Sequence, residues 1–173
     1  MANSSCVRTW KNQIMADLQN DNEIITALGL SKDEDSDDLI YNRLFPHYFI
    51  PTTQEEVKTY IMVEIDIQSN KSRYEPARRD IYSYPTITFT VLSHQDNMEL
   101  NLSGISATRI DYLSELIDRK YNGASGFGIG EIQLTSNIAG NLNDKYRFRQ
   151  LIQVVDEATY LLPEIDQNIA IQV

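Results

Sequence analysis

In two stretches of the chain, largely apolar side chains recur at every second position. This period of two constrains the fold more than any other feature of the sequence. In the first stretch, 57–68, apolar and β-branched residues occupy every second position: Val57, Thr59, Ile61, Val63, Ile65 and Ile67. In the second stretch, threonines at 86, 88 and 90 alternate with Ile87, Phe89 and Val91. Alternate side chains of a strand point to opposite faces. Each stretch therefore predicts a strand with one buried and one more polar face.

Apolar residues on both sides of these strands recur at helical spacing. The first such set predicts a helix over 5–28, divisible at the polar run 20–22 and ended by Gly29: Trp10, Ile14, Leu18, Ile25 and Leu28. The second set predicts a helix capped by Ser106 or Thr108: Ile110, Leu113, Leu116, Ile117 and Tyr121. Segment 31–45 begins with a capping-box pattern and predicts a short helix that closes before Pro46.

Two further strands complete the predicted sheet, at 132–138 and 146–154, joined by a hairpin-type connector at 139–144. The resulting order is α, short α, β, β, α, β, β. It predicts an α+β fold with a mostly antiparallel four-stranded sheet (β-β-α-β-β) that helices cover on one face. We expect a single domain, 1–173, with a core at about 5–156.

A C-terminal arm, 157–173, follows this core and ends in renewed alternation. Its apolar positions are Ile169, Ile171 and Val173. A strand at the end of a chain needs a sheet edge to pair with. That edge can belong to its own domain or to a neighbouring subunit.

Charge and cysteine content exclude several classes of function. The chain has 15 Lys and Arg against 25 Asp and Glu, a net charge of −10, so it has no general affinity for phosphate backbones or anionic membranes. With Cys6, His47 and His94 as its only cysteine and histidines, it cannot form an internal disulfide or a zinc site of the four-cysteine or two-cysteine, two-histidine type. No signal-like start or membrane-length apolar run is present, so we expect a soluble protein of a reducing compartment, without a membrane partner.

Two motifs that suggest ligand binding fail closer tests. The acidic run 33–37 spaces carboxylates as a calcium loop does, but Asp38 stands at the glycine position and Leu44 at that of the bidentate glutamate. The glycine-rich segment 123–130 follows a predicted helix and precedes a strand, the reverse of a dinucleotide-binding loop. We therefore predict no cofactor-binding or metal-binding residues.

Candidate catalytic residues are equally sparse. Glu64 and Asp66 lie on one face of a strand, as in some metal-dependent nucleases, but Gln68 occupies the position where such sites usually have lysine. His94 has no nominated nucleophile nearby, and Cys6 lies in a helix-cap region. The sequence predicts no catalytic residue, and we expect a protein that is not an enzyme.

The loop that joins the first two strands, 69–83, is the one basic patch of the chain. It is too long for a tight hairpin turn. Its cations are Lys71, Arg73, Arg78 and Arg79. The loop is either a solvated tip or an interface that meets acidic faces of neighbouring subunits or a threaded nucleic-acid backbone.

Residues 84–123 and 145–157 resemble a known group of proteins. A strand ending in Ser93-His94, a short polar connector and a helix that begins Arg-Ile-Asp at 109 are similar to the head-tail connector and tail-completion proteins of tailed bacteriophages. The segment KYRFRQLIQVVDE, 145–157, is similar to the last long strand of that group. Segment 31–45 and the C-terminal arm have no clear counterpart in it.

This resemblance implies a non-catalytic, tail-terminator-like neck subunit. Such subunits assemble as a ring, commonly a hexamer, between the capsid connector or adaptor and the tail tube. The implied partners are other copies of the chain, connector and tail-tube proteins, and DNA that passes without specific binding. The implied location is the virion neck, and the host cytoplasm during assembly. If Glu64 and Asp66 faced the lumen, their charge would keep DNA from sticking.

Two other functions remain open on the sequence alone. One is a small phage-encoded metal-dependent nuclease that uses Glu64 and Asp66. The other is an adaptor or inhibitor that binds a host protein through its acidic face.

Overall fold

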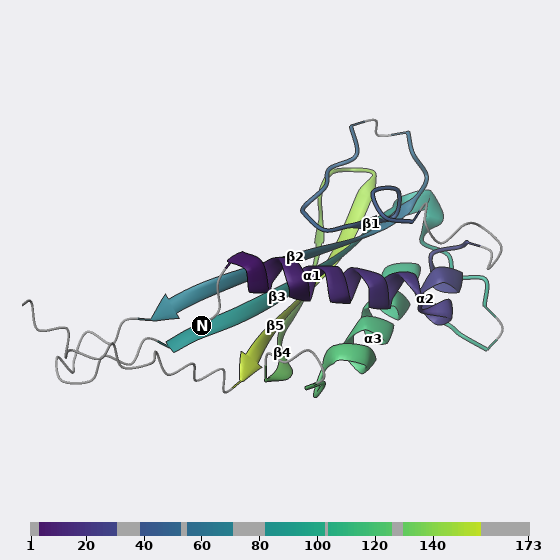
Figure 1. The fold of residues 1–173 in the computed structure, drawn as a ribbon. Helices are drawn as coiled ribbons and strands as arrows, with labels where there is room; N and C mark the ends of the chain where they lie inside the picture. The colour runs from purple at the N-terminus through teal and green to yellow at the C-terminus, as the bar shows by residue number, and fades with distance from the viewer. Residues whose placement is uncertain are drawn as a thin grey trace, which may run out of the picture.

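The computed structural model describes residues 4–30, 39–52, 55–70, 82–102, 104–125 and 130–156. Figure 1 shows three helices on one side of a long, twisted sheet. In chain order the elements are α1 (Ser4–Gln19), α2 (Asn22–Ala27), β1 (Leu44–Phe45), β2 (Thr59–Asn70), β3 (Tyr82–His94), a 3-10 helix (Gln95–Asn97), α3 (Arg109–Tyr121), β4 (Glu131–Asn141) and β5 (Tyr146–Asp156).

The sheet has five strands in the order β1-β2-β3-β5-β4, which corrects the four-stranded prediction. The four predicted strands are present and their pairings are antiparallel. The additional strand, β1, is parallel to β2, with Leu44 opposite Ile61 and Phe45 opposite Met62. Two residues are too few to show alternation, and for this reason the sequence pattern missed the strand.

The predicted helix at 31–45 is wrong where the structure describes it. Residues 31–38 lie outside the described residues, whereas 39–45 form a tight turn and strand β1. The amides of Arg43 and Leu44 both donate to the Leu39 carbonyl at 2.9 Å. Tyr41 has a φ of 65°, and this left-handed conformation is incompatible with a continuing helix.

The other helix predictions are confirmed. The polar run at 20–22 does divide the first helix, because the Asp21 carboxylate accepts hydrogen bonds from the amides of Glu23 and Ile24, at 3.0 and 3.2 Å, and caps α2. Thr108 caps α3 by accepting from the Asp111 amide at 3.3 Å. None of the helices in the described part of the chain is long and apolar enough to cross a membrane.

The main core lies between the helices and one face of the sheet. Phe89 of β3 is fully buried there, and its ring stacks on the ring of Tyr121 of α3 with centroids 4.9 Å apart. The same layer contains fully buried residues of β2, β5 and all three helices: Ile14, Leu18, Ile24, Ile61, Val63, Leu113, Ile117 and Leu151. The apolar sides of the two alternating stretches are thus the sides that the helices cover.

A second, smaller cluster covers the opposite face of the sheet at one end. It consists of Phe45, Tyr60, Met62, Leu92 and Tyr146, with Phe49, Leu142 and Phe148 packed against them. The rings of Phe45 and Phe49 stack with centroids 4.0 Å apart. The Tyr146 hydroxyl donates to the Glu56 carbonyl at 2.6 Å, which fixes segment 55–58 over the cluster. The prediction of a sheet covered on one face is therefore corrected at this end, where both faces are buried.

Candidate functional site

Ser93 of the Ser-His motif and Arg109 of the Arg-Ile-Asp motif meet through Asn97 at the end of the sheet where β3 turns toward α3. The hydroxyls of Thr59 and Ser93, on neighbouring strands, lie 2.8 Å apart, and both residues are fully buried. The Asn97 side-chain amide donates to the Thr59 hydroxyl at 2.8 Å. Buried polar groups that satisfy one another in this way fix a single geometry.

Arg109 joins this network to the helices. Its Nε donates to the Asn97 carbonyl at 2.7 Å, one terminal nitrogen donates to the Glu99 carbonyl at 2.9 Å, and the other donates to the Ala27 carbonyl at the end of α2. The residue is only 9% exposed, and among the described residues it forms no ion pair with a carboxylate. Burial, together with the charge of Arg43, lowers the pKa of the guanidinium. Arg109 is therefore a cation held by backbone carbonyls.

Sequence reasoning quoted Arg109 as part of a motif but missed its role. The sequence did contain a signal for this role. Arg109 is the first residue of α3, where a positive charge is disfavoured by the helix dipole, and an arginine at such a position indicates that other contacts hold it. Gly29 leaves room for the guanidinium, since a Cβ at that position would lie 3.2 Å from an Arg109 terminal nitrogen.

His94 has a local structural role. Its Nδ1 accepts a hydrogen bond from the Asp96 amide at 3.2 Å, and its ring lies edge-on to that of Tyr146, with centroids 5.2 Å apart. The neighbouring Ser93 points to the other face of the strand, toward Thr59. The pair therefore cannot work together as nucleophile and base.

Glu64 and Asp66 lie on the face of the sheet that is turned away from the helices. Their strand partners are Thr88 and Thr86. Glu64 is partly buried and accepts a hydrogen bond from the Tyr48 amide at 3.2 Å, whereas Asp66 is exposed. In the described part of the chain, no group of three or more His, Cys, Asp or Glu side chains could hold a metal ion.

The face around these carboxylates forms a polar and β-branched surface beyond the second cluster, and we call it the open face. It contains Glu64, Asp66, Thr86, Thr88, Ser136, Ile138, Ile152 and Val154, all partly or largely exposed. Ile138 of β4 is the most exposed large apolar residue among them, at 49%. A sheet face of this kind, without enclosed polar groups, suits contact with another surface better than chemistry on a small molecule.

The outer edge of β4 is occupied over its first part only. The amide of Ile132 donates to the Ala124 carbonyl at 2.9 Å, its carbonyl accepts from the Gly123 amide, and the Leu134 amide donates to the Asn122 side chain at 3.1 Å. A bulge follows, between Leu134 and Ser136. From 136 to 141 the strand pairs with β5 on one side and, within the described residues, with no strand on the other. We call residues 136–141 the free edge.

The predicted interface residues fall outside the described residues. These are the basic-loop residues Lys71, Arg73, Arg78 and Arg79, and the arm residues Ile169, Ile171 and Val173. The described strands show where both segments attach. β2 and β3 continue side by side to the pair Asn70 and Tyr82, past the end of α1 (Figure 1), and β5 ends at Asp156 opposite Glu131.

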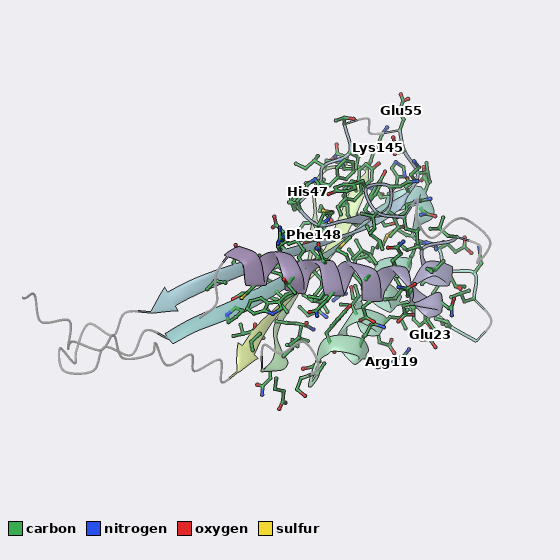
Figure 2. All side chains as sticks on the ribbon, viewed as in Figure 1. Glu23, His47, Glu55, Arg119, Lys145 and Phe148 are labelled. Atoms are coloured by element: carbon green, nitrogen blue, oxygen red, sulfur yellow. The ribbon has the colours of Figure 1, made fainter. Side chains whose placement is uncertain are left out.

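An ionic cluster at the C-terminal end of α3 joins the three helices. Lys120 Nζ lies 2.8 Å from Asp21 Oδ2 and 3.3 Å from Asp17 Oδ1, and the Tyr121 hydroxyl donates to Asp17 at 3.0 Å. In Figure 2 the neighbouring pair Glu23 and Arg119 lies on the outside of the same junction. The cluster therefore links α3 to both α1 and α2.

Replacing Lys120 by methionine should flatten the loss of stability at acid pH. Partial burial alone would raise the pKa of Asp21, but the hydrogen bond from Lys120 and the bonds from the α2 amides lower it below its ordinary value of 3.8. A carboxylate with a lowered pKa stabilises the fold above its unfolded-state pKa, and this contribution disappears as the pH falls through the folded-state pKa. In Lys120→Met we expect the free energy of unfolding at pH 7 to fall by about 0.5–1 kcal/mol, a modest loss because the pair is partly exposed. Between pH 5 and pH 3 the free energy of unfolding should then decrease less in the variant than in the parent protein.

Urea unfolding at several pH values tests this expectation. Arg119→Met, which removes the exposed pair with Glu23, is the matched control and should follow the parent protein. Identical pH dependence in Lys120→Met and the parent would contradict the assignment.

The chain matches one family model over most of its length. Residues 16–155, from the last part of α1 almost to the end of β5, match the model of the YomW family, which is phage-derived. The comparison with curated proteins gave no significant match. Because the family model spans most of the chain, including the Ser-His and Arg-Ile-Asp segments and nearly all of the sheet, the protein belongs to the phage-derived YomW family.

Proposed function

We propose that the protein is a structural, non-enzymatic subunit of a phage neck, similar to a tail terminator. It forms a ring, most simply a hexamer, that joins the capsid connector to the tail tube and lets DNA pass. The phage origin of the family and the resemblance of segments 84–123 and 145–157 to tail-completion proteins support this function. Its location would be the virion neck, and the host cytoplasm during assembly.

The observation that carries the proposal is the uneven covering of the sheet. One face is buried under helices, whereas the open face and the free edge are left to solvent among the described residues. A contact between the free edge of one subunit and a different surface of the next repeats head to tail, and it closes as a ring when the rotation permits. The network around Arg109 supplies a rigid scaffold for such contacts.

Electrostatics supports passage of DNA without binding. Glu64 and Asp66 give the open face two carboxylates, and the chain has a net charge of −10. A ring with this face toward its lumen would repel phosphates and offer no counterion release, the main source of nonspecific affinity. The basic loop, with Lys71, Arg73, Arg78 and Arg79, would then serve contacts with neighbouring subunits or partners rather than wrapping of DNA.

Native mass spectrometry and negative-stain electron microscopy test the proposal. We expect rings of one defined order, either from the protein alone or after mixing with connector or tail-tube protein. The double variant Glu64→Gln, Asp66→Asn should still form rings but should retain more DNA in a filter-binding assay at low salt. Compact monomers under all these conditions would refute the ring, and metal-dependent DNA cleavage abolished by Glu64→Gln would establish a nuclease instead.

A further inference from the structure

The free edge of β4 carries no charge or proline that would keep an edge strand from pairing, and the bulge that interrupts the strand lies before it. Between 136 and 141 the sequence SNIAGN contains neither a charged residue nor a proline. Natural edge strands are commonly protected by lysines, prolines, inward charges or a covering segment. The connection Asn122–Ala124 covers the first part of β4, but its hydrogen bonds stop at Leu134, before the bulge that precedes Ser136. The free edge is therefore suited to accept a further strand.

The other edge of the sheet is different. β1 covers β2 only at Ile61 and Met62. Beyond them β2 carries the carboxylates Glu64 and Asp66, whose charge disfavours the approach of a strand from another acidic chain. Of the two edges, β4 is thus the one that favours pairing.

The chain itself contains a segment that fits the free edge. After Asp156 the sequence continues, and its stretch 168–173, NIAIQV, has the same length as the free edge. It has no charged side chain and alternates, with Ile169, Ile171 and Val173 on one side. On the open face these side chains would cover Ile138, the exposed isoleucine of the free edge. Cross-strand pairs of β-branched side chains stabilise a sheet.

The position of the connections favours a strand from a second copy over one from the same chain. β5 ends at Asp156, opposite Glu131, which is the end of the sheet where the α3–β4 connection enters. That connection already lies along the outer edge of β4 at Ile132 and Leu134. To reach its own free edge, the chain would have to cross it, and connections at one end of a sheet rarely cross. The eleven residues 157–167 can span roughly 35 Å when extended, enough to reach a neighbour.

We propose that residues 168–173 of one copy add as a strand to the free edge of β4, residues 136–141, in a second copy. The contact rests on the ring of the proposed function and identifies one of its subunit interfaces. Its side-chain pairing places the apolar side of the added strand beside Ile138 on the open face.

Cysteine crosslinking between two differently labelled chains tests this contact. In a Cys6→Ala background, one chain carries Ile138→Cys, and the other carries cysteine at 169, 171 or 173. Disulfides require Cα atoms about 4.4–6.8 Å apart, so at least one of the three combinations should give a crosslinked dimer on oxidation. The matched controls Ala170→Cys and Gln172→Cys place the thiol on the opposite side of the strand and should crosslink at least tenfold less. Removal of 168–173 should leave the unfolding curve of the subunit unchanged but weaken its assembly.

The outcomes separate this inference from the proposed function. Crosslinks between two Ile138→Cys chains would show pairing of β4 with β4, and a disulfide only within a chain carrying both cysteines would show pairing in the same copy. Either result overturns the inference. Rings that form normally without 168–173 also overturn it but leave the neck function standing, whereas crosslinked dimers that never close into rings refute the ring and retain the strand contact.

Discussion

Arg109→Met should lower the free energy of unfolding by about 3–5 kcal/mol. The substitution removes three hydrogen bonds from a charged donor, each worth about 1.5–3 kcal/mol, and leaves the carbonyls of Ala27, Asn97 and Glu99 without that partner. Methionine retains much of the apolar stem and so recovers part of the packing. The helix α2 and the connector after β3 should loosen together, because Arg109 is their shared donor.

Equilibrium unfolding in urea measures this loss, with Trp10, the only tryptophan, as a buried fluorescence probe. Arg119→Met is the control, since its exposed ion pair with Glu23 is worth less than about 1 kcal/mol. Arg109→Lys should fall between the two, because one ammonium group does not reproduce the fork of a guanidinium. A loss below about 1 kcal/mol in Arg109→Met would contradict the structural role.

Phe89→Ala should have an effect of similar size for a different reason. Phe89 is fully buried on the central strand β3, opposite Val63 and Leu151 of the neighbouring strands, and stacks on Tyr121. Truncation of a buried phenylalanine leaves a cavity as well as lost contacts and costs about 3–5 kcal/mol. We expect a clear shift of the urea midpoint with little change in slope.

Ile138→Ala is the matched control for this truncation, because Ile138 is about half exposed on the edge strand β4. Its substitution should cost less than about 1 kcal/mol. Equal losses in the two variants would mean that the core does not lie between β3 and α3.

Much of the fold follows from local patterns in the sequence. Alternation at 57–68 and 86–91 predicted β2 and β3 because their apolar sides face one continuous helical layer. Spacing of three and four residues predicted α1 and α3, and Thr108 was one of the two N-caps expected for α3. Such patterns predict an element correctly where one of its faces is buried and the other is exposed to solvent.

The patterns failed where burial had another origin. Tyr60 and Met62 stand on the side of β2 that alternation assigned to the more polar face, yet the aromatic segment with Phe45 and Phe49 covers them. The two-residue strand β1 and the left-handed Tyr41 produce no periodic pattern of apolar residues in the sequence. Long-range contacts of this kind are not encoded in the spacing of neighbouring residues.

For the candidate site, the sequence located residues but not their relationships. The placement of Glu64 and Asp66 on one strand face was predictable from a period of two, and the structure adds that this face is the one turned away from the helices. The convergence of Arg109 on three distant carbonyls depends on how α2, α3 and the connector pack. The free edge could not be predicted from the sequence either, because it begins only where the hydrogen bonds between the α3–β4 connection and β4 end.

The second cluster makes the two ends of the sheet mechanically unlike. Near Tyr60, Leu92 and Tyr146 the strands are held between two layers, so opening one strand there would expose apolar surface on both sides. Near Asp66 and Thr86 the described residues cover only the helical side, and among them local opening requires correspondingly less free energy. The sheet can therefore deform more easily at its thinly covered end, while its doubly covered end keeps its shape.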